Sequence, residues 1–137
     1  MAEGSNGKRS REEARAAIER LDLRRQVEKS MEVYGWERER ALEAERWYRN
    51  FLRLCHEHDG PVTAIGRDAD ELWHLHILDT RKYEADCEAI FGRFLNHTPL
   101  YGEPTAKDKK LFEETVKLYE RTFGAVPERV GWVCIFG

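Results

Sequence analysis

The sequence contains no run of about 18 or more apolar residues, the length that a membrane-spanning helix requires. Its first residues, MAEGSNGKRSREEARAAIER, lack the apolar core of a secretory signal. Neither sign of charge dominates, because the sequence has 23 Lys and Arg and 26 Asp and Glu, for a net charge of −3. The composition therefore predicts no membrane segment and no basic surface for a nucleic-acid partner, and we expect a cytoplasmic protein.

Cysteine and serine are also scarce. Cys55, Cys87 and Cys134 are odd in number and far apart, which favours reduced thiols or metal ligands over a disulfide framework. No serine follows Ser30, so the second half of the chain holds no serine nucleophile. The sequence also has no GxGxxG, no P-loop and no GxSxG, the motifs of dinucleotide, nucleoside-triphosphate and serine-hydrolase sites.

What is present is typical of one globular domain. The chain has 137 residues, of which 41% are hydrophobic and 36% charged, enough for a core without the help of a metal. No internal repeat or low-complexity segment divides it. We expect residues 1–9 to form a disordered leader and residues 10–137 a single helical domain.

Apolar residues recur at helical spacing in several segments, and no segment shows the alternation of a half-buried strand. Capping signals at Ser10 with Glu13, at Gly35 and at Gly124 mark helix ends. We predict an all-α fold, a single compact domain of about five helices, with an apolar C-terminal tail that packs back as an extended segment. The expected helices cover residues 10–34, 36–58, 68–78, 79–94 and 105–123.

Most of the chain's unusual chemistry lies in residues 73–97, WHLHILDTRKYEADCEAIFGRFLNH. Three of the five histidines (His74, His76, His97) and one cysteine, Cys87, fall in this window. Imidazole and thiolate are the side chains that hold transition metals. The window therefore predicts a metal site with these four residues as ligands and zinc, iron or copper as the ion.

The spacing of the two first histidines sets a condition on this site. Successive residues of an α-helix are turned by about 100°, so His74 and His76 point about 200° apart on a regular helix. They can face one metal only where the backbone leaves helical geometry, and a helix restart at Asp79 would provide this. Around the ligands we expect supporting residues: Asp70, placed to orient His74 from one turn earlier, and also Asp79, Tyr83 and Asp86.

Each of these residues also has an ordinary structural interpretation. His74 and His76 can be buried histidines that order the packing, Cys87 a small core residue, Asp79 a helix cap and His97 a helix-terminal residue. A second group, Cys55, His56 and His58, lies at a helix C-terminus, and Cys134 lies in the apolar tail. The sequence leaves the roles of this second group and of Cys134 open.

The window resembles the glycine-rich-domain-containing-protein-like family, whose plant members carry such a module and whose bacterial members are short stand-alone forms. The resemblance covers about Trp47 to Phe123. It implies that the histidines and the cysteine form a motif. Asn96 stands where bacterial members have a second histidine, which leaves His97 as the better candidate. The residues that carry the resemblance are Asp70, Trp73-His74-x-His76, Ile77-Leu78-Asp79-Thr80, Tyr83, Asp86-Cys87, Phe91-Gly92-x-Phe94, His97 and Pro99.

Two functions are compatible with these observations. The first is a small helical metal-binding protein, either without catalytic activity or as a metalloenzyme that acts on a small-molecule or peptide substrate. The second is a non-enzymatic helical interaction module in which the histidines are structural. Metal content distinguishes the two. The sequence does not indicate the substrate or the oligomeric state.

Overall fold

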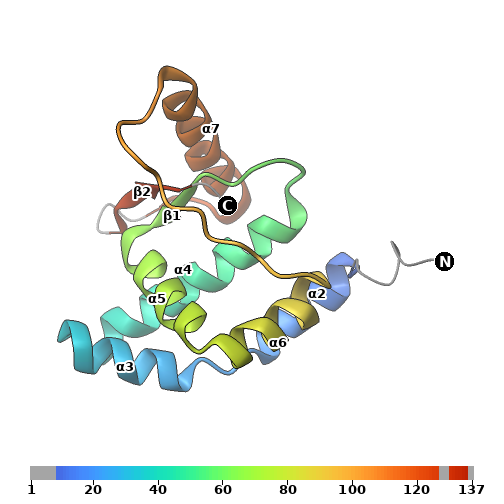
Figure 1. Ribbon diagram of the computed structural model, residues 1–137, viewed down its shortest axis with the longest axis vertical. Coiled ribbons are helices and arrows are strands. Elements are labelled where there is room, and N and C mark those ends of the chain that lie inside the picture. Colours follow the sequence, from blue (N-terminus) through green and yellow to red (C-terminus); the bar gives the residue numbers. More distant parts are fainter. Residues whose placement is uncertain (1–8, 127–129, 136–137) are drawn as a thin grey trace.

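The computed structural model describes residues 9–126 and 130–135, and it is predominantly helical (Figure 1). Within these residues it contains six helices and a small two-stranded sheet, in one compact domain. The fold class was therefore predicted correctly in its main feature, with one more helix than expected. The elements are α2 (Arg11–Arg20), α3 (Arg24–Tyr34), α4 (Arg38–Glu57), β1 (Ala64–Gly66), α5 (Arg67–Leu78), α6 (Thr80–Phe91), α7 (Ala106–Phe123) and β2 (Trp132–Cys134).

The additional helix arises because the first predicted helix is broken at residues 21–23. Ser10 and Glu13 form the expected capping box at its start. At its end, the guanidinium of Arg49 on α4 donates to the main-chain oxygens of Ile18 and Leu21. These bonds satisfy carbonyls that a continuing helix would use. The interruption thus depends on a residue far away in the sequence, which periodicity alone does not reveal.

Helix α4 is the longest element and packs against α2, α3, α5 and β1. Its buried side carries Tyr48 and Phe51, which are almost inaccessible to solvent. From α5 and α6, Trp73 and Tyr83 complete the centre of the core. Three of the four tryptophans are buried, and Trp132 is half-buried against Tyr119.

The segment 61–67, predicted as a loop, instead contains β1 and the first residue of α5. Strand β1 pairs in antiparallel fashion with β2, with Ala64 opposite Cys134 and Gly66 opposite Trp132. The expectation that the apolar tail packs back as an extended segment is thus confirmed for its described residues. Gly66 is required here, because a Cβ atom at this position would lie 2.7 Å from Cγ1 of Val130.

Helices α5 and α6 meet at Asp79, as predicted, but α6 ends at Phe91 and not at Phe94. Gly92 adopts a left-handed conformation (φ 71°) and its N–H bonds to the carbonyl of Glu88, which terminates the helix. Figure 1 shows the segment after α6 running back across the molecule toward β1 and α7. This return path carries His97.

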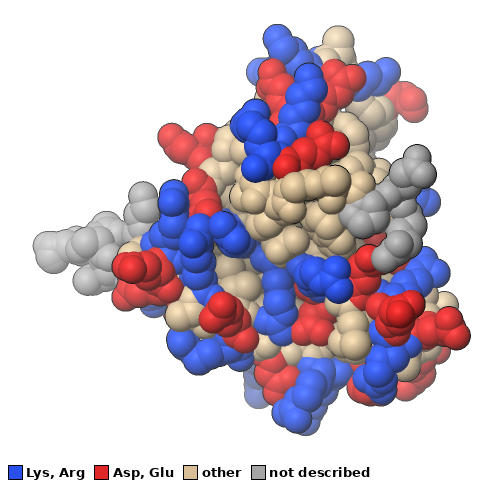
Figure 2. All heavy atoms as spheres, turned by 180° about the vertical axis from the view of Figure 1, so that it is seen from behind, with Lys and Arg blue, Asp and Glu red and all other residues tan. Residues whose placement is uncertain are grey.

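The predicted leader, residues 1–9, lies outside the described residues except for Arg9, whose guanidinium contacts Glu88. None of the helices in the described part of the chain combines the length and apolar composition that crossing a bilayer requires. The face seen in Figure 2 intersperses Lys and Arg with Asp and Glu around an uncharged area. That face therefore presents no field of a single sign.

Candidate metal centre

Asp70, His74 and His97 converge at one point beside α5. Asp70 and His74 lie four residues apart on α5 and therefore share a face of the helix. Oδ1 of Asp70 lies 3.4 Å from Nε2 of His74 and 3.3 Å from Nε2 of His97. The two Nε2 atoms are 3.0 Å apart. No other group of three or more His, Cys, Asp and Glu side chains in the described residues has this geometry.

The return of the chain after Gly92 brings His97 to this point, and two contacts fix it there. The hydroxyl of Tyr83 on α6 donates to the main-chain oxygen of Leu95 at 2.6 Å. The His97 ring then stacks on the indole of Trp73, with ring centroids 4.2 Å apart. The indole N–H of Trp73 donates to the same Tyr83 hydroxyl, at 2.9 Å. Trp73 and Tyr83 therefore hold the loop against α5, and Tyr83 has the supporting role expected for it.

A second carboxylate lies behind His74. Oε1 of Glu71 is 3.4 Å from Nδ1 of His74, on the side of the ring away from the cluster, and it accepts a hydrogen bond of 3.3 Å from the hydroxyl of Tyr34 on α3. Burial, followed by the charge of Glu71, raises the pKa of Tyr34, so that this hydroxyl remains a donor. Glu71 thus connects Tyr34 on α3 with the Nδ1 edge of the His74 ring.

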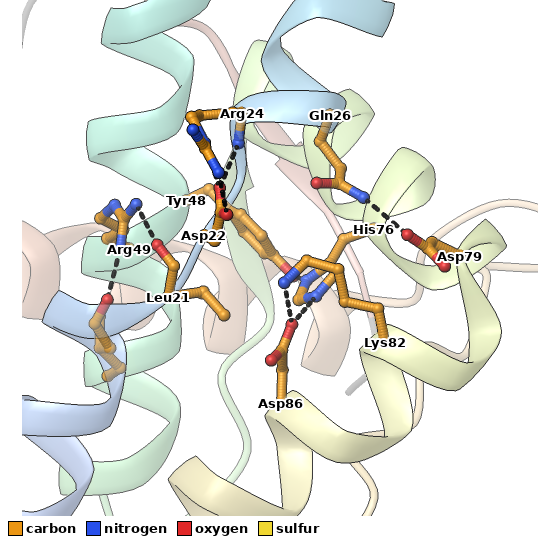
Figure 3. A network of polar contacts seen from close by, with 11 residues as sticks. Leu21, Asp22, Arg24, Gln26, Tyr48, Arg49, His76, Asp79, Lys82 and Asp86 are labelled. Atoms are coloured by element: carbon orange, nitrogen blue, oxygen red, sulfur yellow. Dashed lines mark hydrogen bonds and ion pairs between the residues drawn. The ribbon is translucent and has the colours of Figure 1, made fainter.

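His76 does not join this group, which corrects the predicted convergence of His74 and His76. The helix restart at Asp79 comes after His76, so His76 remains inside α5 and points to the other side of it. Figure 3 shows its ring between Tyr48 and Asp86. Nδ1 lies 2.7 Å from the Tyr48 hydroxyl and Nε2 lies 2.8 Å from Oδ2 of Asp86.

These contacts define the chemical state of His76. Asp86 only accepts, so the His76 proton lies on Nε2 and Tyr48 donates to Nδ1. Burial is the main cause that lowers the pKa of His76, and the hydrogen bond with Asp86 opposes it. His76 is therefore a neutral histidine that joins α4, α5 and α6 inside the core.

Cys87 also lies outside the cluster, as a buried core residue. Burial raises the pKa of its thiol, which disfavours the thiolate that a metal ligand or a nucleophile needs. The structure thus does not bring Cys87 to the other predicted ligands, and its position agrees with its alternative interpretation as a small core side chain.

The remaining predicted support residues surround His76 and not the cluster. Asp86 also accepts from Nζ of Lys82 at 2.9 Å (Figure 3). Asp79 is the N-cap residue of α6, but its side chain makes no capping hydrogen bond and instead accepts from Nε2 of Gln26 at 3.4 Å. Both carboxylates therefore fix the packing between helices.

The residues whose roles the sequence left open have structural places. Nε2 of His56 contacts the main-chain oxygen of Arg9 at 2.8 Å. Burial raises the pKa of the Cys55 thiol and that of Cys134. None of these three residues, nor His58, belongs to the cluster around His74.

Sequence reasoning assigned Asp70 a supporting role and overlooked Glu71. The sequence does contain a pattern that points to Asp70 and Glu71 as site residues. Asp70-Glu71-x-x-His74 has the spacing of the zinc motif H-E-x-x-H, with an aspartate in place of the first histidine. In that motif the first and last residues lie one helical turn apart and bind one ion. Asp70 and His74 occupy these two positions here.

A family model described as UCP032817-like matches residues 14–115. The chain belongs to the UCP032817-like family. The matched region begins in α2 and ends in α7, and it contains the whole of the cluster. The description of the UCP032817-like family names no activity, so any function must be inferred from the site.

The resemblance to the glycine-rich-domain-containing-protein-like family is therefore corrected. It depended on a few residues within one window, whereas the UCP032817-like match extends over 14–115 and includes the helices that precede that window. No curated protein and no solved structure matches the chain.

Proposed function

We propose that this protein binds a divalent transition metal ion through Asp70, His74 and His97. The observation that supports this proposal is the triangle of ligand atoms, with sides of 3.0, 3.3 and 3.4 Å. Two ligands about 2.0–2.1 Å from one tetrahedral ion are separated by about 3.3–3.4 Å, and at right angles by about 3.0 Å. The triangle thus has the size of one face of a metal's coordination shell.

Hydrogen bonds alone stabilise this triangle poorly. A carboxylate has no proton to donate, and each neutral imidazole has only one, on either of its nitrogens. If only one of the two histidines carries its proton on Nε2, the Nε2 of the other histidine and Oδ1 of Asp70 face each other with lone pairs. If both do, the N–H groups of His74 and His97 face each other over 3.0 Å. A cation among the three atoms accepts all three lone pairs and removes this conflict.

The donor set favours zinc or iron(II). Two imidazoles with one carboxylate occur in catalytic zinc sites and in non-haem iron(II) sites. Blue-copper sites additionally use a cysteine thiolate, and Cys87 lies apart from this group, in the core. Calcium and magnesium prefer shells made of oxygen atoms. Copper, expected from the sequence along with zinc and iron, is accordingly the least favoured of the three.

We also propose a cytoplasmic location and a small ligand or substrate. The three cysteines are free thiols in the structure, which suits a cytoplasmic location. A small molecule or a peptide is the substrate that we expect if the centre is catalytic.

Metal analysis tests the proposal. Protein purified without an affinity tag and dialysed with zinc or iron(II) should hold one ion per chain. The double variant His74→Ala, His97→Ala should hold none, while His58→Ala, a histidine outside the cluster, should match the wild type. Absence of stoichiometric metal from the wild type under all these conditions contradicts the proposal and favours the non-enzymatic interaction module.

A further inference from the structure

The cluster supplies three protein ligands and no fourth histidine or cysteine. All five histidines and all three cysteines fall within the described residues, since 1–8, 127–129 and 136–137 contain neither type. In the described part of the chain, no side chain beyond Asp70, His74 and His97 belongs to the group. Zinc takes at least four ligands and iron(II) commonly six, so at least one position falls to a ligand from outside the protein.

Exposure shows on which side this position lies. The side chains of His97 and Asp70 are only 13% and 17% exposed, and one face of the His97 ring is covered by Trp73. The side chain of His74 is 44% exposed, and that of Glu71 beside it is 42% exposed. The cluster is therefore enclosed at His97 and Asp70, and His74 is its exposed member.

We infer that the centre is open, and that a small oxygen-donor ligand from solution binds to the metal on its exposed side, next to His74. This inference rests on the proposed function and specifies it further. A structural zinc site is closed by four protein ligands, whereas a catalytic one keeps a position for water or substrate. The Asp70–His74–His97 centre has the second composition.

Charge indicates which donors suit this position. A divalent ion with Asp70 as its anionic ligand retains one positive charge, which attracts the oxygen of a carboxylate, a hydroxamate or a carbonyl group. Glu71 offsets part of this charge, but its Oε1 accepts from Tyr34 and faces Nδ1 of His74. The carboxylate thus lies behind the histidine ring and leaves the metal's outer position free. Ammonium groups and other cations lack this attraction.

Cobalt(II) provides a direct test, because it replaces zinc in such sites and its visible absorption reports the number and type of its ligands. The wild-type protein is first dialysed with cobalt(II), and its metal content is measured. Acetohydroxamate, a small bidentate oxygen donor, is then titrated into the loaded protein. We expect one cobalt per chain and a saturable change of the visible spectrum. The same change should occur with His58→Ala.

The outcomes separate the two proposals. One bound cobalt with a spectrum that acetohydroxamate leaves unchanged overturns the open centre, while metal binding stands. No bound cobalt, together with no bound zinc or iron, overturns both. A spectral change that survives in the double variant His74→Ala, His97→Ala also overturns the inference, since the cobalt would then lie elsewhere.

Discussion

The imidazole ring of His97 lies nearly parallel to the indole of Trp73, with 17° between the ring planes and 4.2 Å between centroids. The two residues come from different elements, a helix and the loop that returns after α6. Trp73 is completely buried, and its indole N–H reaches Tyr83, which holds the same loop at Leu95. The Trp73 side chain thereby joins the core to the candidate metal centre.

Replacement of Trp73 by alanine should therefore affect both stability and the loop. We expect Trp73→Ala to lower the free energy of unfolding by about 3–5 kcal/mol, as for other truncations of large core residues. Trp73→Phe retains a ring and should lose less. Chemical denaturation measures both, with the exposed Tyr101→Ala as control. Wild-type stability of Trp73→Ala would contradict the packing described for it.

His74 and His76 offer a matched pair of substitutions. His76→Leu leaves the buried Tyr48 hydroxyl without its partner, which should cost about 1–3 kcal/mol of stability. Its metal content should equal that of the wild type. His74→Leu should show the reverse: loss of the metal, and a change in apo-protein stability within about 0.5 kcal/mol, because this side chain is partly exposed. Denaturation and metal analysis of the same two samples test this. Equal loss of metal in both variants would contradict the separation of the two histidines.

Local signals in the sequence correctly predicted several helix ends. Ser10 and Thr105 form capping boxes with residues three positions later, and Gly35 ends a helix in a left-handed conformation. Contacts between distant residues were not predictable in this way. The break after α2 depends on Arg49, and the sheet pairs two three-residue strands that lie far apart in the sequence. Such short strands have too few residues to show an alternating pattern.

The candidate site could be predicted only in part for the same reason. The spacing of Asp70 and His74 places them on one helix face, and this follows from helical geometry alone. The approach of His97 depends on how Gly92 and Tyr83 direct the loop, which no spacing reveals. His76 was assigned to the site on the assumption that the helix restart at Asp79 lets His74 and His76 turn toward one point. In the structure the helix continues to Leu78, so His76 turns into the core.

Glu71 should tune the proposed centre without binding the metal itself. Its carboxylate faces Nδ1 of His74, and loss of such an outer contact typically weakens metal binding by about 10–100-fold. We expect Glu71→Gln to fall in this range, and Tyr34→Phe to have a smaller effect in the same direction. Zinc competition titrations measure these affinities, with Glu113→Gln on the exposed face of α7 as the matched control. Identical affinities for wild type and Glu71→Gln would show that Glu71 does not orient His74.

Glu57 provides a test that is independent of any metal. Its carboxylate accepts two hydrogen bonds from Arg15 on α2, at 2.7 and 3.0 Å, and one of 2.9 Å from Arg53 on α4. The hydrogen bonds from Arg15 are the main cause that lowers the pKa of Glu57. Burial raises this pKa, and the hydrogen bond from Arg53 lowers it further. The pair with Arg15 thus joins two helices near the start of the fold.

The direction of this pKa shift determines how stability depends on pH. A carboxyl whose pKa is lower in the folded state binds protons less readily there than in the unfolded chain. Its contribution is therefore fully present above the unfolded pKa of about 4.3 and disappears as pH falls through the lower folded value.

Glu57→Gln mimics the protonated form. We expect it to cost about 1 kcal/mol at about pH 7, and nearly nothing at the lowest pH at which both proteins still fold. Denaturant titrations of both proteins across this range measure the difference, and a double-mutant cycle with Arg15→Leu assigns it to the pair. A cost that stays constant as the pH falls would show that the loss comes from packing and not from the charge of Glu57.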